Sequence, residues 1–234
     1  MVRVVLNGKL VVVVHINVTV TPTDSVLPPI VFTHGWVDNS TVWNSVRREL
    51  GDRTTMAWDL RGHGQSDSPP PGEYGREAVL ADLQHVLGQF DKPVVLAGHS
   101  LGGYLSLAYT LQHPEQVAGL ALIASGPGFR NADAREQWNR AVDLSAAKLD
   151  LPAGSEEISK HTDSWVLDEL GTITAPTVVI VGENDKRFQP AMKVFEAKLN
   201  VIHSAVIGGA GHSVHRKYPG PVAAAIRQLD VARN

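Results

Sequence analysis

Short apolar runs rich in β-branched residues alternate with amphipathic helical segments along most of this sequence. The runs that are expected to form strands are residues 30–33, 54–58, 93–97, 120–124, 176–181 and 202–207. Strands that are apolar throughout are buried on both faces, which is typical of parallel sheets covered by helices. The pattern therefore predicts an α/β fold with a mainly parallel sheet and helices on both of its faces.

The alternation breaks between about 127 and 173, where residues 131–149 have a helical pattern and a shorter helical pattern follows near 164–170. We predict that residues 127–173 form a short helical lid on a core made of residues 1–126 and 174–234. No repeat, low-complexity tract or linker divides the sequence, so the chain is expected to be a single domain overall.

Composition argues against several classes of function. The chain has 234 residues, a net charge of −3 and no dense run of Lys and Arg, so neither nucleic acid nor a membrane is an expected partner. Its lack of cysteine rules out disulfides and a cysteine nucleophile and fits a cytoplasmic location. The apolar run at 10–14 is too short for a membrane helix and is expected to be a strand. The oligomeric state stays open.

The strongest local signal is the run from Gly98 to Gly102, which has Ser100 at its centre and lies between an expected strand and a helical pattern that starts at Tyr104. Glycines two residues before and two residues after the serine allow a sharp strand-to-helix turn with close chain packing. A helix that begins behind the serine directs its amides and its dipole toward negative charge that develops there. Ser100 is therefore the expected nucleophile, and the backbone amide of Leu101 is an expected oxyanion donor.

A second oxyanion donor is expected from the loop that follows the run 30–33. His34, Gly35 and Trp36 occupy this loop, and the backbone amide of Trp36 is the useful group. His34 is expected to shape the loop through a hydrogen bond, which its position suits better than a catalytic role. Gly35 permits a tight turn.

A serine hydroxyl needs a base that accepts its proton, and the base needs an orienting partner. Among ten histidines, His212 is preferred because its loop follows the last expected strand, and His215 is the alternative. Asp185, in the loop after the run 176–181, is the preferred acid, and Glu183 is the alternative. His212 and His215 also have the spacing of a metal pair, but no zincin motif accompanies them and no metal is expected.

Together these motifs resemble the α/β-hydrolase superfamily, in which the triad follows the chain order Ser, Asp, His. Residues 59–67 are similar to the family's loop after its third large strand, and residues 173–177 are similar to its return from the lid. The resemblance covers nearly the whole chain and implies the α/β-hydrolase fold, a serine esterase-like or lipase-like enzyme with a short lid, and no cofactor. Asp59 and Arg61 are expected to hold loops together.

Ser100 argues against haloalkane dehalogenases and epoxide hydrolases, which have Asp at the nucleophile position. The resemblance implies a carboxylic-ester hydrolase that acts on small to medium apolar acyl substrates, which are small molecules, through an acyl-enzyme. Lactone opening, carbon–carbon bond hydrolysis, perhydrolysis and synthase-type elimination occur on similar scaffolds and are alternatives. A ligand-binding receptor with a retained hydrolase fold is an alternative from another class.

Substrate contacts are expected from residues near the nucleophile along the chain and from apolar residues of the lid. They are Trp36, Leu101 and Phe129 in the first group and Trp138, Trp165 and Leu167 in the second. For the lid residues, packing of the lid onto the core is an equally good interpretation. The short lid implies a pocket that is small or open.

Overall fold

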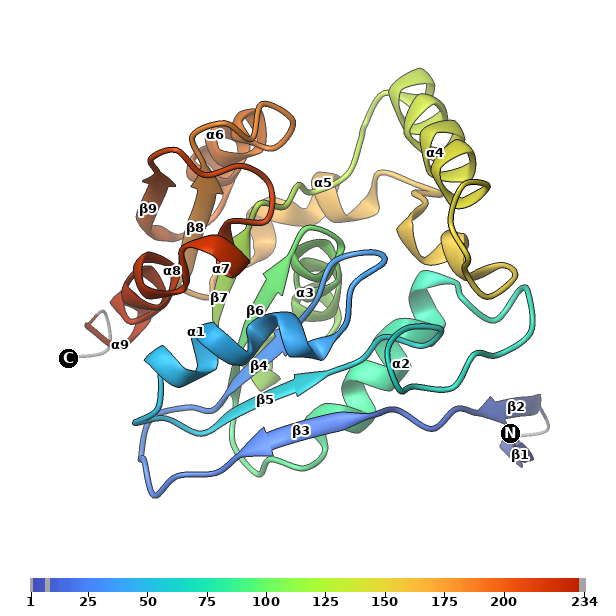
Figure 1. Cartoon of the computed structure of the whole chain (residues 1–234), viewed down its shortest axis with the longest axis horizontal. Helices are drawn as coiled ribbons and strands as arrows, with labels where there is room; N and C mark the ends of the chain where they lie inside the picture. Colours follow the sequence, from blue (N-terminus) through green and yellow to red (C-terminus); the bar gives the residue numbers. More distant parts are fainter. Residues whose placement is uncertain (1, 7–8, 232–234) are drawn as a thin grey trace.

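The central layer of the protein is a seven-stranded sheet (Figure 1). The computed structural model describes residues 2–6 and 9–231. The strands lie in the order β3-β5-β4-β6-β7-β8-β9; β3, at one edge, runs antiparallel to its neighbour, and the other pairs are parallel. Their bounds are β3 Val18–Thr21, β4 Ile30–Thr33, β5 Thr55–Trp58, β6 Val94–His99, β7 Val117–Ile123, β8 Thr177–Gly182 and β9 Val201–Ile207. The predicted α/β class with a mainly parallel sheet is confirmed.

Helices cover both faces of the sheet, because the strand side chains alternate between two apolar clusters. In β4, Ile30 and Phe32 pack into one cluster and Val31 into the other, as the two-residue period of a strand requires. The Ile30 face is covered by α1 Asn44–Glu49, α7 Val214–Lys217, α8 Pro219–Ile226 and α9 Gln228–Val231. The Val31 face is covered by α2 Arg76–Leu87, α3 Leu101–Gln112 and α6 Gln189–Lys198.

Two helices interrupt the alternation between β7 and β8. They are α4 Ala132–Ala146 and α5 Trp165–Glu169, accompanied by the 3-10 turns η3 Ser155–Ser159 and η4 Leu170–Thr172. Figure 1 shows α4 as the outermost helix at the upper right, with α5 closer to the sheet. Val142 is the buried residue of α4, so this helix adds little to the core. These elements fall inside the interval 127–173, whose separation from the core as a lid stays a prediction.

The N-terminal segment forms more strands than the single run at 10–14 predicts. β1 Val2–Leu6 and β2 Lys9–Val13 pair as an antiparallel two-stranded sheet, so the expected strand exists and begins one residue earlier. The edge strand β3 was not expected, because its threonines interrupt the apolar pattern of a buried strand. The remaining 3-10 turns are η1 Ser40–Trp43 and η2 Pro114–Gln116.

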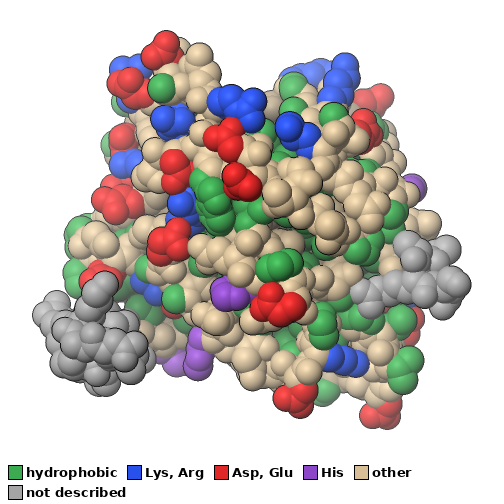
Figure 2. All heavy atoms as spheres, turned by 180° about the vertical axis from the view of Figure 1, so that it is seen from behind, with side chains coloured by type: hydrophobic (Ala, Val, Ile, Leu, Met, Phe, Trp, Pro, Cys, Tyr) green, Lys and Arg blue, Asp and Glu red, His purple; other side chains and the backbone are tan. Residues whose placement is uncertain are grey.

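The rear face of the molecule carries acidic and basic side chains interspersed with apolar ones (Figure 2). Such a mixture creates no broad field of one sign over that face, in agreement with the small net charge of −3. Within residues 2–6 and 9–231, no helix is long and apolar enough to cross a membrane.

The strand register brings four loops to one edge of the sheet. Thr33 on β4 is the partner of Gly98 on β6, so the loop after β4 begins beside the turn after β6. The loops after β8 and β9 are tied together by the Asn184 amide, which donates to the Ala210 carbonyl at 2.8 Å. Because parallel strands end at the same edge, the loops that follow them meet there.

Candidate active site

Ser100 lies in the sharp turn between β6 and α3, with backbone angles φ 51° and ψ −114°. This conformation is strained for a residue with a side chain, and the Ser100 amide holds it by donating to the Ile123 carbonyl at 2.9 Å. Glycines make the turn possible, since a Cβ on Gly98 would overlap the backbone of Gly102 and a Cβ on Gly102 would overlap the Thr33 carbonyl. The side chain of Ser100 is thereby held at the end of β6, at the start of α3.

His212 and Asp185 are joined by a hydrogen bond of 2.8 Å from His212 Nδ1 to Asp185 Oδ2. A carboxylate only accepts, so the imidazole proton lies on Nδ1 and Nε2 is left as a proton acceptor. The Asp185 side chain is 4% exposed and that of His212 is 42% exposed, so the acid is shielded while the imidazole stays accessible. Glu183, the alternative acid, accepts instead from the Gly209 amide at 2.8 Å.

His99 and His215 pack behind His212. His99 Nε2 donates to the His212 carbonyl at 3.0 Å, and its ring centre lies 4.7 Å from that of His212 and 4.2 Å from that of His215. Burial lowers the pKa of His99 well below its usual value and the pKa of His215 to about 3, so both rings are neutral at pH 7. His215, the alternative base, is fully buried against Trp43. It is therefore His212 that reaches Asp185.

A possible set of metal donors lies beside these rings. Nitrogens of His99 and His215 and a carboxylate oxygen of Asp38 are within 4.8 Å of one another. Arg216 already forms an ion pair with Asp38, and a Cβ on Gly35 would lie 2.8 Å from His99 Nδ1, so that nitrogen has little room beside it. The donor atoms leave little room for an ion, and Arg216 already balances the charge of Asp38, so we assign no metal to this set.

The loop after β4 runs directly against the nucleophilic turn. A Cβ on Gly35 would be in van der Waals contact with Ser100 Cβ at 3.4 Å and too close to His99 Nδ1 at 2.8 Å, so the loop approaches this turn closely. The next residue along this loop is Trp36, and the next residue after Ser100 is Leu101. The two backbone amides expected as oxyanion donors therefore belong to the two segments that adjoin Ser100, and that of Leu101 lies at the positive end of α3.

Polar residues of the neighbouring loops hold those loops in shape. His34 Nδ1 donates to the following carbonyl at 2.7 Å, and its Nε2 accepts from the Leu60 amide at 3.0 Å. Burial lowers the pKa of His34 to about 4, and the neighbouring imidazole of His63 is the next largest cause. Asp59 accepts backbone amides at 2.6 and 2.9 Å, and Arg61 pairs with Asp82 at 2.6 Å. These contacts give His34, Asp59 and Arg61 the structural roles expected from the sequence.

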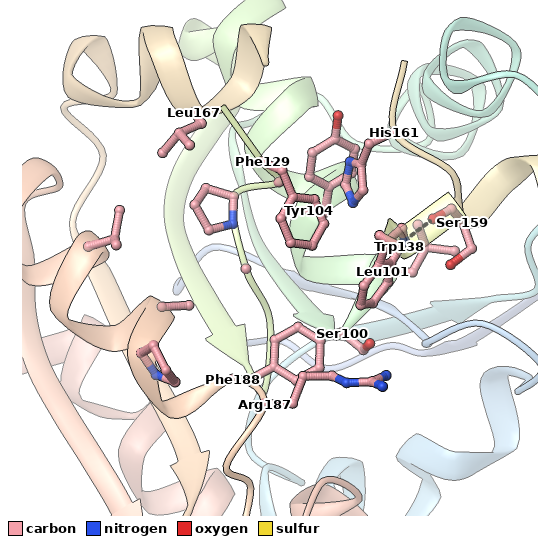
Figure 3. Close-up of a pocket in the computed structure, with 16 residues that line it drawn as sticks. Ser100, Leu101, Tyr104, Phe129, Trp138, Ser159, His161, Leu167, Arg187 and Phe188 are labelled. Atoms are coloured by element: carbon pink, nitrogen blue, oxygen red, sulfur yellow. Dashed lines mark hydrogen bonds between the residues drawn. The ribbon is translucent and has the colours of Figure 1, made fainter. Parts of the chain in front are cut away.

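A cavity of about 460 Å³ opens beside Ser100 (Figure 3). Its wall is mainly apolar and is built by α3, by the segment after β7, by α4, η3 and α5, and by α6. The larger apolar side chains in the wall are Leu101, Tyr104, Phe129, Trp138, Leu167 and Phe188. All of these except Tyr104 and Phe188 were expected from the sequence. A cavity of this size and character suits a small molecule.

Two expected contact residues lie outside the cavity wall. Trp36 packs against the apolar cluster on the Val31 face of the sheet. Trp165 packs there too, and the guanidinium of Arg76 lies 5.0 Å from its ring centre. For Trp165 the structure thus favours the interpretation that it packs the lid onto the core, because its ring is in contact with α2.

Several cavity residues were not expected from the sequence. Tyr104 lies one helical turn after Ser100, and Arg187 and Phe188 follow Asp185 in the same loop, so closeness along the chain to the expected triad could have identified them. Ser159 and His161 belong to the interval 127–173. Their place depends on how this interval packs, for which the sequence carries no local signal.

His161 is held rigidly in the cavity wall. Its backbone makes two hydrogen bonds of 2.9 Å with the Asn139 side chain, and its ring meets that of Tyr104 edge-on at 4.5 Å. Burial lowers its pKa to about 4, so the ring is neutral at pH 7. On the opposite side of the cavity, Phe188 stacks on the His212 ring with centres 4.9 Å apart. Phe188 therefore both lines the cavity and packs against the imidazole that contacts Asp185.

A family model described as "Alpha/beta hydrolase family" matches residues 30–225. An uncharacterized protein of Mycobacterium tuberculosis is 41% identical over 134 residues, which are 56% of this chain and 36% of that protein. Pimeloyl-[acyl-carrier protein] methyl ester esterase of Citrobacter koseri is 35% identical over 153 residues, which are 62% of this chain and 54% of that protein. The chain thus spans only about a third to about half of the length of these relatives.

Among solved structures, a thermophilic esterase from Thermogutta terrifontis is similar, with a TM-score of 0.78 at 24% sequence identity. The match covers 99% of this chain and 98% of that chain. At this level of identity the likeness concerns the fold, and it extends over the sheet, its covering helices and the segment between β7 and β8.

Proposed function

The chain belongs to the α/β-hydrolase family, and from this premise we propose that it is a serine hydrolase that cleaves carboxylic esters of small to medium apolar acyl groups. Ser100 is the nucleophile, His212 is the base, and Asp185 orients the base. The observation that supports this best is the 2.8 Å hydrogen bond between Asp185 and His212, at the same sheet edge as the strained turn of Ser100. A serine nucleophile, an imidazole base and an acid that orients the base are what ester cleavage by serine requires.

The proposed acylation begins when His212 Nε2 takes the hydroxyl proton of Ser100 while Ser100 Oγ bonds to the ester carbonyl carbon. The carbonyl oxygen becomes an oxyanion and accepts hydrogen bonds from the amides of Trp36 and Leu101. The bond to the alkoxy oxygen then breaks, and the alcohol leaves with the proton from His212. Water repeats the sequence on the acyl-enzyme, which releases the acid and restores Ser100. Asp185 stays ionised and stabilises the imidazolium.

The cavity supports an acyl group of modest size. The cavity has a volume of about 460 Å³. If each non-hydrogen atom of a ligand takes about 30 Å³, as a water molecule does in the liquid, the cavity holds about fifteen such atoms. The wall offers Leu101, Leu167 and Phe188 to an apolar chain, and burial of such a chain drives binding. The printed name of the Citrobacter koseri relative, a methyl ester esterase, points to the same bond type. This chemistry needs neither a metal nor an organic cofactor.

Lactone opening, carbon–carbon bond hydrolysis and perhydrolysis would use the same three residues and are the alternatives within the family. A receptor with a retained fold is the alternative without turnover. The 42% exposure of the His212 side chain favours turnover, because the base must also activate the water that releases the acyl group.

The test is labelling with a fluorophosphonate probe, followed by mass spectrometry of the modified peptide. We expect label on Ser100, none in Ser100→Ala, and a loss of about a thousandfold or more in p-nitrophenyl butyrate hydrolysis for both Ser100→Ala and His212→Ala. Ser145→Ala removes an exposed serine of α4 and is the matched control, which should keep both label and activity.

Absence of label from the folded wild-type protein would overturn the nucleophile assignment and favour the receptor. Label at Ser100 without hydrolysis of short esters would retain the nucleophile and overturn the ester substrate, and lactones and carbon–carbon substrates would then be screened.

A further inference from the structure

Among the residues that line the cavity, Arg187 is the one with a formal charge at pH 7. It lies between Asp185 and the first residue of α6, and its guanidinium carbon is 5.4 Å from the ring centre of Trp138. Figure 3 shows its side chain on the Ser100 side of the cavity, away from Leu167. Stacking on an indole face is attractive for a cation and limits its rotamers, so the charge is held at the cavity wall beside Trp138.

Arg187 has no acidic partner within residues 2–6 and 9–231, and unlike Arg47, Arg48 and Arg135, which also lack one, it donates no side-chain hydrogen bond there. Arg61, Arg76 and Arg130 each pair with an aspartate. Within residues 2–6 and 9–231, no salt bridge or side-chain hydrogen bond of Arg187 is formed, and its neighbour Lys186 instead donates to a backbone carbonyl. The five N–H donors of the Arg187 guanidinium are thus available to a ligand, in a fork geometry that matches a carboxylate.

The surroundings of the cavity add to this positive potential. The N-terminus of α6, where the partial charge of a helix is positive, begins two residues after Arg187. On the other side, Arg135 Nη1 donates to the Phe129 carbonyl at 3.3 Å. The pKa of His161 is lowered to about 4 by burial first and then by the charges of Arg76 and Arg135, with Asp163 opposing them. His161 is therefore neutral at pH 7, and Arg187 is the charged group that the cavity wall presents to a ligand.

We propose that Arg187 forms a carboxylate-binding subsite, so that the substrate is an ester with an apolar acyl group in the cavity and a carboxylate in its solvent-facing half. The inference rests on the proposed ester hydrolysis and adds a substrate class to it. The exposed position of Arg187 places the carboxylate near solvent, and apolar lining residues such as Leu167 and Val194 leave the acyl group an apolar place. A charge at the opening avoids the desolvation that a buried carboxylate would require.

The experiment compares 4-(butyryloxy)benzoate with its neutral amide, 4-(butyryloxy)benzamide, which has the same shape without the charge. The quantity measured is the ratio of kcat/KM for the carboxylate to kcat/KM for the amide. The intrinsic reactivities of the two esters cancel when this ratio is compared between variants. We expect Arg187→Gln to lower the ratio about tenfold, mainly through KM, since a charged hydrogen bond near solvent is partly screened. Arg187→Lys should keep part of the preference, because it retains the charge and loses the fork.

Lys186→Gln is the matched control, because it removes the same charge one residue away at an exposed side chain outside the cavity wall. It should leave the ratio within about twofold of the wild-type value, and added salt should lower the wild-type ratio. An unchanged ratio in Arg187→Gln, or an equal fall in Arg187→Gln and Lys186→Gln, would overturn the subsite.

Failure of the subsite is distinguishable from failure of ester hydrolysis. If wild-type protein hydrolyses neither ester and takes no fluorophosphonate label, the proposed reaction fails, and the same two compounds are then titrated calorimetrically into wild-type and Arg187→Gln protein. Weaker binding of the carboxylate, by about fivefold or more, in Arg187→Gln alone would still support the subsite. Equal binding by the two proteins would overturn it.

Discussion

His99 directly precedes Ser100 in the chain, and its Nε2 donates to the backbone carbonyl of His212 at 3.0 Å. Its other ring nitrogen is buried and has no hydrogen-bond partner in the described part of the chain, so this one bond is what orients the ring. A hydrogen bond of this kind is worth about 1 kcal/mol net. If this hydrogen bond fixes the backbone that carries the imidazole of His212, its loss will lower kcat as well as the free energy of unfolding.

We predict that His99→Phe lowers kcat for p-nitrophenyl butyrate about tenfold and leaves KM within about twofold. Phenylalanine retains the ring packing and cannot donate to the His212 carbonyl, so the base is less well positioned. His99→Gln supplies an N–H donor and should recover most of the lost kcat. Steady-state kinetics of both variants, with thermal melts as the folding control, checks this. Equal losses in the two variants would show that His99 only fills space.

At the scale of elements, Arg76 in the first turn of α2 fastens the segment between β7 and β8 to the rest of the molecule. Its guanidinium forms two hydrogen bonds with Asp163, at 2.9 and 2.8 Å, and one with the Tyr104 hydroxyl at 3.2 Å. This pairing holds the pKa of Asp163 below its usual value. The Asp163 side chain is 41% exposed, so solvent screens the pair and its net contribution to stability is about 1 kcal/mol or less.

Asp163→Asn is expected to lower the melting temperature by up to about 2–4 °C at low salt, because it removes the charge that holds Arg76. The difference should shrink at about 0.5 M salt, where the wild-type pair is screened. Arg140→Gln breaks an exposed ion pair with Glu136 within α4 and should shift the melting temperature by less than about 1 °C. Scanning calorimetry of both variants and the wild-type protein at the two salt concentrations measures these differences in melting temperature. A difference that is independent of salt would mean that the charge is not the anchor.

The strands of the sheet could be predicted because burial on both faces leaves an uninterrupted apolar run, as in β4, which the structure has at residues 30–33. The start of α3 could not be predicted from such a pattern. The helix begins at Leu101, three residues before the apolar pattern from Tyr104, because Gly102 and Gly103 are poor helix formers. They are required where the Thr33 carbonyl and a serine side chain approach the helix too closely for a Cβ.

The candidate site likewise has residues that could be predicted from the sequence and residues that could not. Asp185 and His212 follow strands, so the sequence could pair them before the structure brought them within 2.8 Å. His161 and Ser159 reach the cavity through contacts within residues 127–173, such as the 2.8 Å hydrogen bond from Trp138 Nε1 to the Ser159 carbonyl. A contact between two such segments depends on tertiary packing, and local sequence patterns carry no record of it.

At the scale of the whole molecule, five buried histidines couple stability to pH. They are at most 8% exposed, and burial is the first cause of the lowered pKa of each: His34, His63, His99, His161 and His215. The pKa is about 4 for His34 and His161 and about 3 for His215, against 6.5 for a free histidine. Below pH 6.5 the unfolded chain therefore binds more protons than the folded one, and stability is lost as pH falls toward these values.

We predict that the urea midpoint of unfolding falls steadily from pH 7 to pH 5, a range in which most carboxylates of the unfolded chain have not yet bound protons. Each buried histidine contributes up to about 1.4 kcal/mol per pH unit to this slope. The ring nitrogens of His215 make no hydrogen bond within the described residues, so His215→Met removes a titrating group without leaving a partner unpaired and should make the slope shallower by about that amount. His85→Gln, an exposed histidine on α2, should leave the slope unchanged. If both variants kept the wild-type slope, His215 would not titrate on unfolding, and burial would not be what holds its pKa down.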